Sequence, residues 1–319
     1  MGSRPASFSL TTPGPLRLYS TTELLRMPPP TWLIEPIIPA GGLVGLYGPP
    51  GTCKSFLAID MALSVASTRP WQGHETTHGP VLYIAAEGST GITKRVLAWL
   101  ETRVVKPGDV DVAWLTTGVP VNVDSDDMTR LMDRLMEELP SPPTLVIVDT
   151  LARCFDGDEN QQEDMGRFIA GIDWMRHEFG STVMVVHHTR LDGDRERGNT
   201  AFRGAADAML SVKRSGNGTI HVECTKQKDA EEFKGLSFDL VGVPGTDSCV
   251  VSTDARQAQK EVRTGEILHI LRTLGPLTWD AWLSSSGIAR TTFHRTVVEL
   301  KEKGEIIREK GQWRVIDSE

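Results

Sequence analysis

A glycine- and proline-rich segment has the residue types and spacing that hold nucleotide phosphates. It follows an apolar run, opens a helical pattern, and consists of Gly48, Pro49, Pro50, Gly51, Thr52, Cys53, Lys54, Ser55 and Phe56. In such a loop, main-chain N–H groups and the helix N-terminus surround the anionic phosphates. Lys54 would reach the β- and γ-phosphates, and the Ser55 hydroxyl would bind Mg²⁺. These residues predict a site for ATP and Mg²⁺.

The loop departs from the usual pattern at one position. Glycine usually precedes the lysine, whereas here the Cys53 side chain must fit where backbone approaches phosphate. Two other interpretations stay open: an accidental glycine- and proline-rich turn, and a protein that binds nucleotide without hydrolysing it. The order of apolar run, loop and helical pattern favours a phosphate site.

Two carboxylates follow apolar runs, where parallel strands would present them at one edge of a sheet. The run 145–149 ends in Asp149, which is the Walker B pattern, and this carboxylate would hold Mg²⁺ through water opposite Ser55. Glu87 follows the run 81–85 and would orient and deprotonate the attacking water. A helix cap or an exposed surface residue is the alternative for Glu87.

A histidine pair, His187 and His188, ends another apolar run. Neighbouring residues of a strand point to opposite faces, so the pair is poorly suited to binding one metal ion. One imidazole could contact the γ-phosphate and report its loss, while the other could hydrogen-bond to a neighbouring loop. Two histidines with a purely structural role at a strand end are the alternative.

The elements that must position these residues form an α/β pattern. Short apolar runs typical of strands buried in a parallel sheet lie at 43–47, 81–85, 145–149 and 182–187. Helical patterns alternate with them at 54–67, 92–104, 128–139 and 164–179. This alternation predicts a doubly wound sheet. Later strands, expected to extend the sheet as antiparallel strands, lie at 208–212, 219–225, 236–243 and 248–253.

The C-terminal residues predict a small helical unit that follows a polar linker at 254–261. Residues 262–316 have the pattern of a winged helix-turn-helix, with a wing formed by two short strands after the third helix. Arg290 and Arg295 fall outward near the start of that third helix, where a recognition helix meets DNA. The net charge of residues 256–319 is +2, which is mild, so binding to a protein partner is the alternative.

Length and composition limit the classes of protein to which the chain can belong. The 319 residues are 39% apolar and 24% charged, which excludes disorder throughout. We expect an N-terminal extension at 1–31 with a short helix at 22–26, a core at 32–254 and the helical unit at 255–319. There is no apolar run long enough for a membrane helix, no secretory signal and no CxxC spacing among the four cysteines. A reducing cytoplasm is therefore expected.

The overall charge is a poor guide to nucleic-acid binding. Lys and Arg total 34 against 42 Asp and Glu, which gives a net charge of −8 and argues against such a partner. Arginines nevertheless gather in the segment 190–203, so the placement of charge keeps DNA among the expected partners.

Several blocks together resemble the RepA-like ATPases of the RecA/DnaB superfamily, over roughly residues 20–250. The blocks are Trp32-Leu33-Ile34, Gly48–Ala58, Tyr83–Gly88, Val148–Arg153, Asp158-Glu159-Asn160, Val186–Thr189 and Arg203–Asp207. The family includes a plasmid-encoded hexameric replicative helicase. The resemblance implies a RecA-like P-loop core, here followed by the winged helix, and in this family the residue before the P-loop lysine is often not glycine.

The resemblance also implies roles within one subunit. Glu87 matches the catalytic glutamate, Asp149 matches the Walker B aspartate, and His188 matches the γ-phosphate sensor. A basic residue from a neighbouring subunit would complete each site. Arg197 resembles the arginine finger of RepA, whereas Lys226 and Lys228 resemble the paired basic fingers of DnaB-type helicases; solvated surface cations are the alternative for each.

In RecA-like rings, the loop after the sensor strand faces the central channel. By resemblance, the loop 190–203 would contact single-stranded DNA phosphates through Arg190, Arg195 and Arg203. A mobile surface loop without a DNA contact is the other interpretation of the same residues.

We therefore expect an ATP-hydrolysing motor on single-stranded DNA, of the hexameric replicative helicase type. A bacterial host and a phage, plasmid or prophage origin fit this expectation, and the winged helix could bind replication proteins. Two alternatives stay open: a recombination mediator or loader ATPase that binds DNA without unwinding it, and a nucleotide-gated adaptor that recruits a replication partner.

Overall fold

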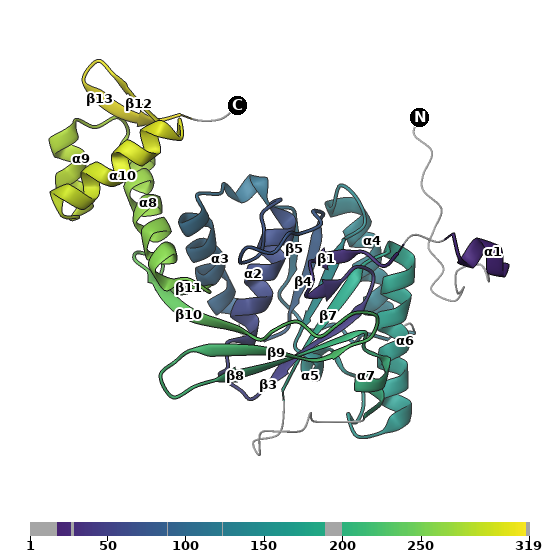
Figure 1. The fold of residues 1–319 in the computed structure, drawn as a ribbon. Coiled ribbons are helices and arrows are strands. Elements are labelled where there is room, and N and C mark those ends of the chain that lie inside the picture. Colours follow the sequence, from purple (N-terminus) through teal and green to yellow (C-terminus); the bar gives the residue numbers. More distant parts are fainter. Residues whose placement is uncertain (1–17, 27–28, 88, 123, 189–199, 317–319) are drawn as a thin grey trace, which may run out of the picture. The chain divides into compact units, whose positions relative to one another are not determined.

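A computed structural model describes residues 18–26, 29–87, 89–122, 124–188 and 200–316 (Figure 1). The chain divides into two compact units. Unit 1 comprises residues 1–92 and 108–237, and unit 2 comprises residues 93–107 and 238–319. This division keeps residues 248–274 in one unit, whereas the expected boundary at 254/255 separates them. The three-part division at 31/32 and 254/255 stays a prediction.

The sheet of unit 1 has a parallel centre. Its strands are β3 (Leu43–Gly48), β4 (Val81–Ala85), β5 (Val112–Leu115), β6 (Leu145–Asp149), β7 (Thr182–His188), β8 (Ala208–Arg214) and β9 (Ile220–Gln227). They lie side by side in the order β9-β8-β3-β7-β6-β4-β5. All neighbouring pairs are parallel except β8 with β9. The predicted α/β class, with a mostly parallel sheet and an antiparallel extension, is confirmed.

One strand runs in the opposite direction to our expectation. β8 pairs with β3 in parallel, so the prediction that the residues 208–212 join the sheet as an antiparallel strand is wrong. A helix, α7 (Thr200–Ala205), lies between β7 and β8 in the chain. Such a connection is long enough to return the chain to the same end of the sheet, as a parallel neighbour requires. The antiparallel extension of unit 1 therefore begins only at β9.

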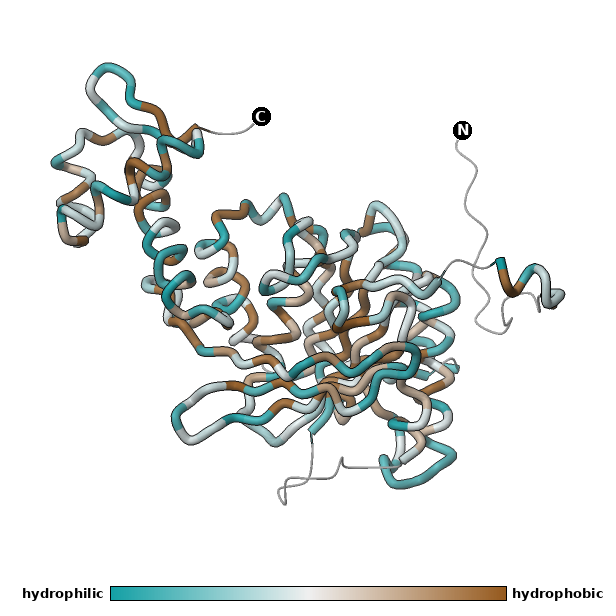
Figure 2. Tube along the Cα trace, in the orientation of Figure 1, coloured by the Kyte–Doolittle hydropathy of each residue, from teal (hydrophilic) through white to brown (hydrophobic). Residues whose placement is uncertain are grey.

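Helices pack against this sheet through apolar side chains. The helices of unit 1 include α2 (Lys54–Ala66), α4 (Asp126–Glu138), α5 (Leu151–Cys154) and α6 (Gln162–Phe179), whereas α3 (Ser89–Arg103) begins in unit 1 and lies mostly in unit 2. Almost every residue of α2 is buried, and α6 buries one stripe that includes Phe168 and Ile172. Figure 2 shows the hydrophobic residues concentrated along the central strands and their covering helices. The four predicted helices and the four predicted parallel strands are confirmed, with ends that differ by a few residues.

The smaller elements of unit 1 were not all expected. The short helix α1 (Thr21–Leu24) is capped by Ser20 and Glu23 and buries none of its residues. It confirms the short helix expected in this segment. The hairpin β1 (Trp32–Ile34) and β2 (Ile38–Pro39) and the 3-10 helix η1 (Pro107–Asp109) carry no clear sequence signal. Each helix among the described residues is too short or too polar to span a lipid bilayer.

Unit 2 builds its own small core. Its elements are the antiparallel pair β10 (Leu236–Val243) and β11 (Ser248–Ser252), the helices α8 (Ala255–Leu274), α9 (Trp279–Ser286) and α10 (Arg290–Glu302), and the hairpin β12 (Ile306–Glu309) and β13 (Gln312–Val315). Trp282, Phe293 and Trp313 pack together between the three helices and the hairpin. Three helices followed by a hairpin are the elements expected of a winged helix-turn-helix, and that assignment stays a prediction.

The expected linker at 254–261 is wrong. Helix α8 begins at Ala255, and the Asp254 carboxylate accepts hydrogen bonds from the backbone N–H groups of Arg256 and Gln257, both at 3.0 Å. The polar residues that suggested a linker are good helix formers, and aspartate is a preferred N-cap. Within unit 2 this part of α8 packs against the end of α3, where Arg103 forms an ion pair with Glu261.

Candidate active site

The sheet brings the predicted nucleotide residues to one edge. The register pairs Gly48 at the end of β3 with His188 at the end of β7. It also pairs Ala85 at the end of β4 with Asp149 at the end of β6. The P-loop, Asp149, His188 and Glu87 therefore all lie at the carboxyl edge of the four central strands, which is where ligands bind in open α/β sheets.

Lys54 lies within the loop that precedes it. Its ammonium group donates to the carbonyl oxygens of Gly48 at 2.8 Å and Pro49 at 2.9 Å, while the Thr52 hydroxyl also donates to Pro49 at 2.9 Å. A Cβ atom on Gly48 would lie 2.1 Å from the Val212 carbonyl oxygen, so only glycine fits at the start of the loop. These contacts fix a compact turn whose backbone opens onto the N-terminus of α2.

The Lys54 ammonium lies in a buried environment. Lys54 has only 4% of its surface exposed. Burial lowers its pKa to about 8, although the negative charges of Asp149 and Glu87 raise the pKa in part. Burial penalises the charged form of a lysine, and a phosphate group would supply the missing countercharge. The site is therefore suited to an anion.

Cys53 adopts the backbone conformation that favours glycine. Its φ angle is +69°, in the left-handed region, and it occupies the N-cap position of α2 without a side-chain cap. The Cys53 side chain is partly exposed, so the loop accommodates it without burying it. The cysteine at this position of the P-loop thus introduces local backbone strain, but the loop still leads directly into α2.

We predict that Cys53→Gly raises the free energy of unfolding by up to about 1 kcal/mol and preserves ATP hydrolysis. Left-handed backbone costs a side-chain-bearing residue roughly 1–2 kcal/mol, and the greater freedom of glycine in the unfolded chain offsets part of this gain. Urea denaturation measures the change. Cys53→Ala, which keeps a Cβ atom in the strained conformation, serves as the control and should show no gain. A Cys53→Gly protein that is less stable than the parent would contradict the explanation.

Asp149 and Ser55 are the residues expected to bind Mg²⁺. Asp149 is buried at the end of β6, and the Tyr83 hydroxyl donates a 2.7 Å hydrogen bond to its Oδ2 atom. Ser55 follows Lys54 in the first turn of α2 and is partly exposed. A carboxylate and a hydroxyl oxygen are hard ligands of the kind that Mg²⁺ prefers, usually with water completing its shell. The residues present therefore fit Mg²⁺ bound to a nucleotide.

Glu87 contacts side chains from two other strand ends. Its Oε1 atom accepts a 3.3 Å hydrogen bond from the Thr150 hydroxyl and lies 3.4 Å from Arg153 Nε. Its Oε2 atom lies 3.8 Å from His188 Nε2. The carboxylate is thus held between the end of β6 and the end of β7. It lies close enough to Lys54 for its negative charge to raise the pKa of that lysine.

His188 is placed to act as a neutral hydrogen-bond donor. Burial lowers its pKa, and the positive charge of Lys54 lowers it further, against a raising effect of Glu87. The imidazole is therefore neutral at physiological pH. Its Nδ1 atom is buried and makes no hydrogen bond to the residues that the structure describes. His187, on the opposite face of β7, is buried, so the two rings do not form a joint metal site.

Three residues of this site were missed by sequence reasoning: Tyr83, Thr150 and Arg153. Tyr83 lies within β4 and becomes a partner of Asp149 only through the pairing of β4 with β6. Thr150 and Arg153 follow Asp149 in the chain and stand in one of the blocks that carry the family resemblance. The block Val148–Arg153 could have drawn attention to these two residues, but the resemblance assigns neither of them a role.

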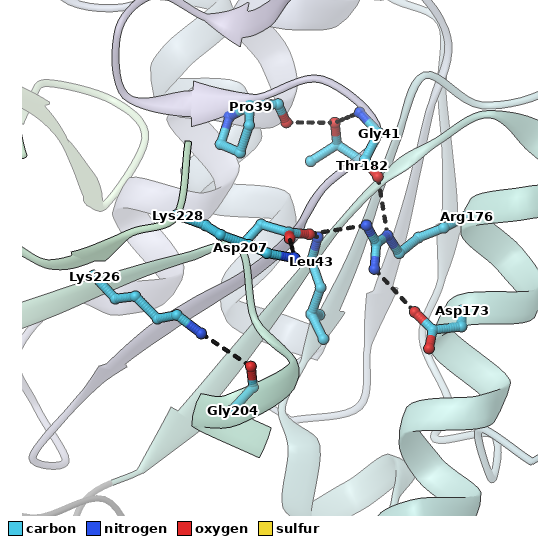
Figure 3. Close-up of polar contacts among 10 residues, drawn as sticks. All are labelled: Pro39, Gly41, Leu43, Asp173, Arg176, Thr182, Gly204, Asp207, Lys226 and Lys228. Atoms are coloured by element: carbon cyan, nitrogen blue, oxygen red, sulfur yellow. Dashed lines mark hydrogen bonds and ion pairs between the residues drawn. The ribbon is translucent and has the colours of Figure 1, made fainter. Parts of the chain in front are cut away.

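Lys226 and Lys228 lie at the other edge of the sheet. Lys226 donates to the carbonyl oxygens of Arg203 at 2.7 Å and Gly204 at 3.0 Å. Figure 3 shows its contact with Gly204 and the contact of Lys228 with Asp207, at 3.5 Å. The end of β9 pairs with the start of β8, which lies beside the start of β3. The structure therefore does not bring these lysines to the Lys54 site of the same chain, and their role in a neighbour's site stays a prediction.

Asp207 organises this opposite edge. Its Oδ2 atom accepts hydrogen bonds from the Leu43 backbone N–H at 2.9 Å and from the Arg176 guanidinium at 2.8 Å (Figure 3). Through these contacts it joins the start of β3 to helix α6, and Lys228 joins the end of β9 to the same carboxylate. The lysine pair thus already has a structural role within the chain.

The predicted DNA contacts stay predictions, and the structure describes three of the five arginines named for them. Arg190 and Arg195, like the predicted finger Arg197, lie outside the described residues. Arg203 is half-buried and donates a 2.7 Å hydrogen bond to the Thr225 carbonyl oxygen, so it is engaged within the chain. Arg290 and Arg295 are both exposed in the first half of α10, as a recognition helix requires.

A solved structure and a family model are similar to this chain. The crystal structure of the RadB recombinase is similar to this chain, with 17% sequence identity, a TM-score of 0.47, and coverage of 66% of this chain and 90% of that chain. A family model described as an AAA domain matches residues 18–194, which include the P-loop, Glu87, Asp149 and His188. Because this match spans more than half of the 319 residues, the chain belongs to the AAA domain family of P-loop ATPases.

Proposed function

We propose that this chain is an ATP-hydrolysing motor on single-stranded DNA, of the RepA-like hexameric helicase type. The observation that carries the proposal is the meeting of Lys54, Asp149, Glu87 and His188 at one edge of the parallel sheet. Membership in an ATPase family supports hydrolysis. Action on DNA goes beyond hydrolysis, and it rests on the family resemblance and on the arginines that follow His188 in the sequence.

Each side chain has a distinct part in hydrolysis. The Lys54 ammonium and the N–H groups at the start of α2 stabilise negative charge on the phosphates. Glu87 accepts a proton from the attacking water, and neutral His188 donates its Nε2–H to the γ-phosphate. Bound Mg²⁺, held by Ser55 and Asp149, would neutralise charge that develops on the phosphate oxygens.

The sensor is directly continuous with the predicted DNA loop. Arg190 follows His188 by two positions in the chain, and the segment up to Arg203 is rich in arginine and glycine. Loss of the γ-phosphate at His188 would therefore shift the segment that follows it, and basic side chains there would move with the DNA phosphates they contact. This continuity supports coupling between hydrolysis and movement along a strand.

Completion of the site by a second copy is part of the proposal. Arg197, or the pair Lys226 and Lys228, would reach the nucleotide of a neighbouring subunit in a ring, most consistent with a hexamer. The C-terminal winged helix would contact DNA through Arg290 and Arg295, or recruit a replication protein. Native mass measurement with ATP and single-stranded DNA tests the ring directly.

The deciding experiment measures ATP hydrolysis and unwinding with the full chain. We expect single-stranded DNA to stimulate hydrolysis several-fold, and a forked duplex to be unwound when ATP is present. Glu87→Gln should lower the hydrolysis rate by about 10²–10⁴ while ATP binding is retained, as expected for loss of a general base. Stimulation without unwinding would favour a mediator or loader, and assembly that depends on ATP without stimulation would favour an adaptor.

A further inference from the structure

Arg153, one of the arginines of unit 1 that the structure describes, contacts the catalytic candidate Glu87. Its Nε atom lies 3.4 Å from Glu87 Oε1, across the junction between the ends of β4 and β6. The Arg153 side chain is 66% exposed and that of Glu87 is 39% exposed. An ion pair between partly exposed side chains contributes little to stability. The pairing therefore calls for an explanation other than support of the fold.

The contacts of Glu87 divide between its two oxygen atoms. Oε1 faces two donors, the Thr150 hydroxyl and the Arg153 guanidinium. Oε2 faces His188, on the side where the γ-phosphate would lie. A carboxylate that acts as general base needs one oxygen aimed at the water and held there, because a loss of orientation lowers the rate steeply. This division anchors one oxygen and leaves the other to accept the proton.

The backbone of Arg153 is itself held in place. A Cβ atom on Gly118 would lie 2.4 Å from the Arg153 carbonyl oxygen, so the segment beside it packs directly against this residue. The next residue is fixed as well, because Val121 N–H donates a 2.8 Å hydrogen bond to the Cys154 carbonyl oxygen. Helix α5 therefore presents the Arg153 side chain from a rigid base.

We infer that Arg153 is a positioning residue for ATP hydrolysis: it anchors Glu87 Oε1, together with Thr150, and so directs Glu87 Oε2 at the attacking water. The inference rests on the proposed role of Glu87 as general base. It gives Arg153 a role in cis, within one subunit, that is separate from the basic residue expected from a neighbour.

The test compares steady-state ATP hydrolysis of full-length variants with single-stranded DNA present. Arg153→Ala should lower kcat about tenfold or more and change KM for ATP less than about twofold, because Arg153 acts through Glu87 and not on the nucleotide. Arg153→Lys, which keeps a cation beside Oε1, should restore part of kcat. Arg134→Ala, which removes an equally exposed arginine paired with Glu138 in the same unit, is the matched control and should leave kcat unchanged.

A double-variant comparison separates this role from the others. In the Glu87→Gln background, Arg153→Ala should change kcat by less than about twofold, since the group that it positions is already lost. A full tenfold loss in that background, a rise in KM alone, or a kcat equal to the parent would each overturn the inference. If Glu87→Gln itself hydrolyses ATP normally, the proposed function fails first, so the two failures are distinguishable.

Discussion

Lys54→Ala is expected to lower ATP hydrolysis at least about a hundredfold and to weaken nucleotide binding. The side chain is buried at the carboxyl edge of β3, with its ammonium against the P-loop carbonyls, where a phosphate would meet it. Removal of one preorganised donor to developing phosphate charge typically costs two to three orders of magnitude in rate. Release of inorganic phosphate from ATP measures the effect.

The control for this substitution is a lysine of the same unit outside the site. Lys213 pairs with Glu223 at 3.7 Å on an exposed part of β8 and β9, so Lys213→Ala should hydrolyse ATP at the parental rate. A Lys54→Ala protein that hydrolyses ATP normally would contradict the assignment of the whole P-loop. Circular dichroism of both variants separates a loss of chemistry from a loss of folding.

Nucleotide affinity is expected to fall as the pH rises above about 8. The pKa of Lys54 is lowered to about 8, so the free protein loses this charge above that pH. Bound phosphates stabilise the ammonium, and binding at higher pH must therefore take up a proton. Nucleotide affinity is therefore constant below the lowered pKa of Lys54 and declines about tenfold for each pH unit above it.

Calorimetric titration with a non-hydrolysable ATP analogue measures this linkage. At pH 9, buffers of different ionisation enthalpy should reveal uptake of about one proton per nucleotide, and at pH 7 uptake should be close to none. Lys54→Arg keeps its charge throughout this range and should abolish the uptake. Equal affinity of the parent protein at about pH 7 and pH 9.5 would show that Lys54 does not titrate as described.

The parallel core was predictable because its strands are buried on both faces. The runs 81–85 and 145–149 are continuous in apolar residues and match β4 and β6 without a change of boundary. β5 was missed because all four of its residues are only half-buried, so no strong apolar run marks it. The start of α8 was misread because its polar residues are compatible with a loop until Asp254 is seen to cap a helix.

The site residues that belong to short sequence motifs could be predicted, whereas those that depend on strand pairing could not. The P-loop, Asp149 and Glu87 each follow an apolar run, and parallel pairing places such ends together. Arg153 could not be assigned because its contact with Glu87 depends on the register of β4 beside β6. For Lys226, no local pattern tells which edge of the sheet a late antiparallel strand will reach.

The central position of β3 has a consequence for synthesis of the chain. β3 ends at Gly48, and its two neighbours in the sheet are made well after it: β7 begins at Thr182, and β8 ends at Arg214. A nascent chain that stops before Thr182 holds the P-loop on a strand with neither neighbour present. The nucleotide-binding edge therefore assembles only after most of unit 1 has left the ribosome, and early fragments of this protein should not bind ATP.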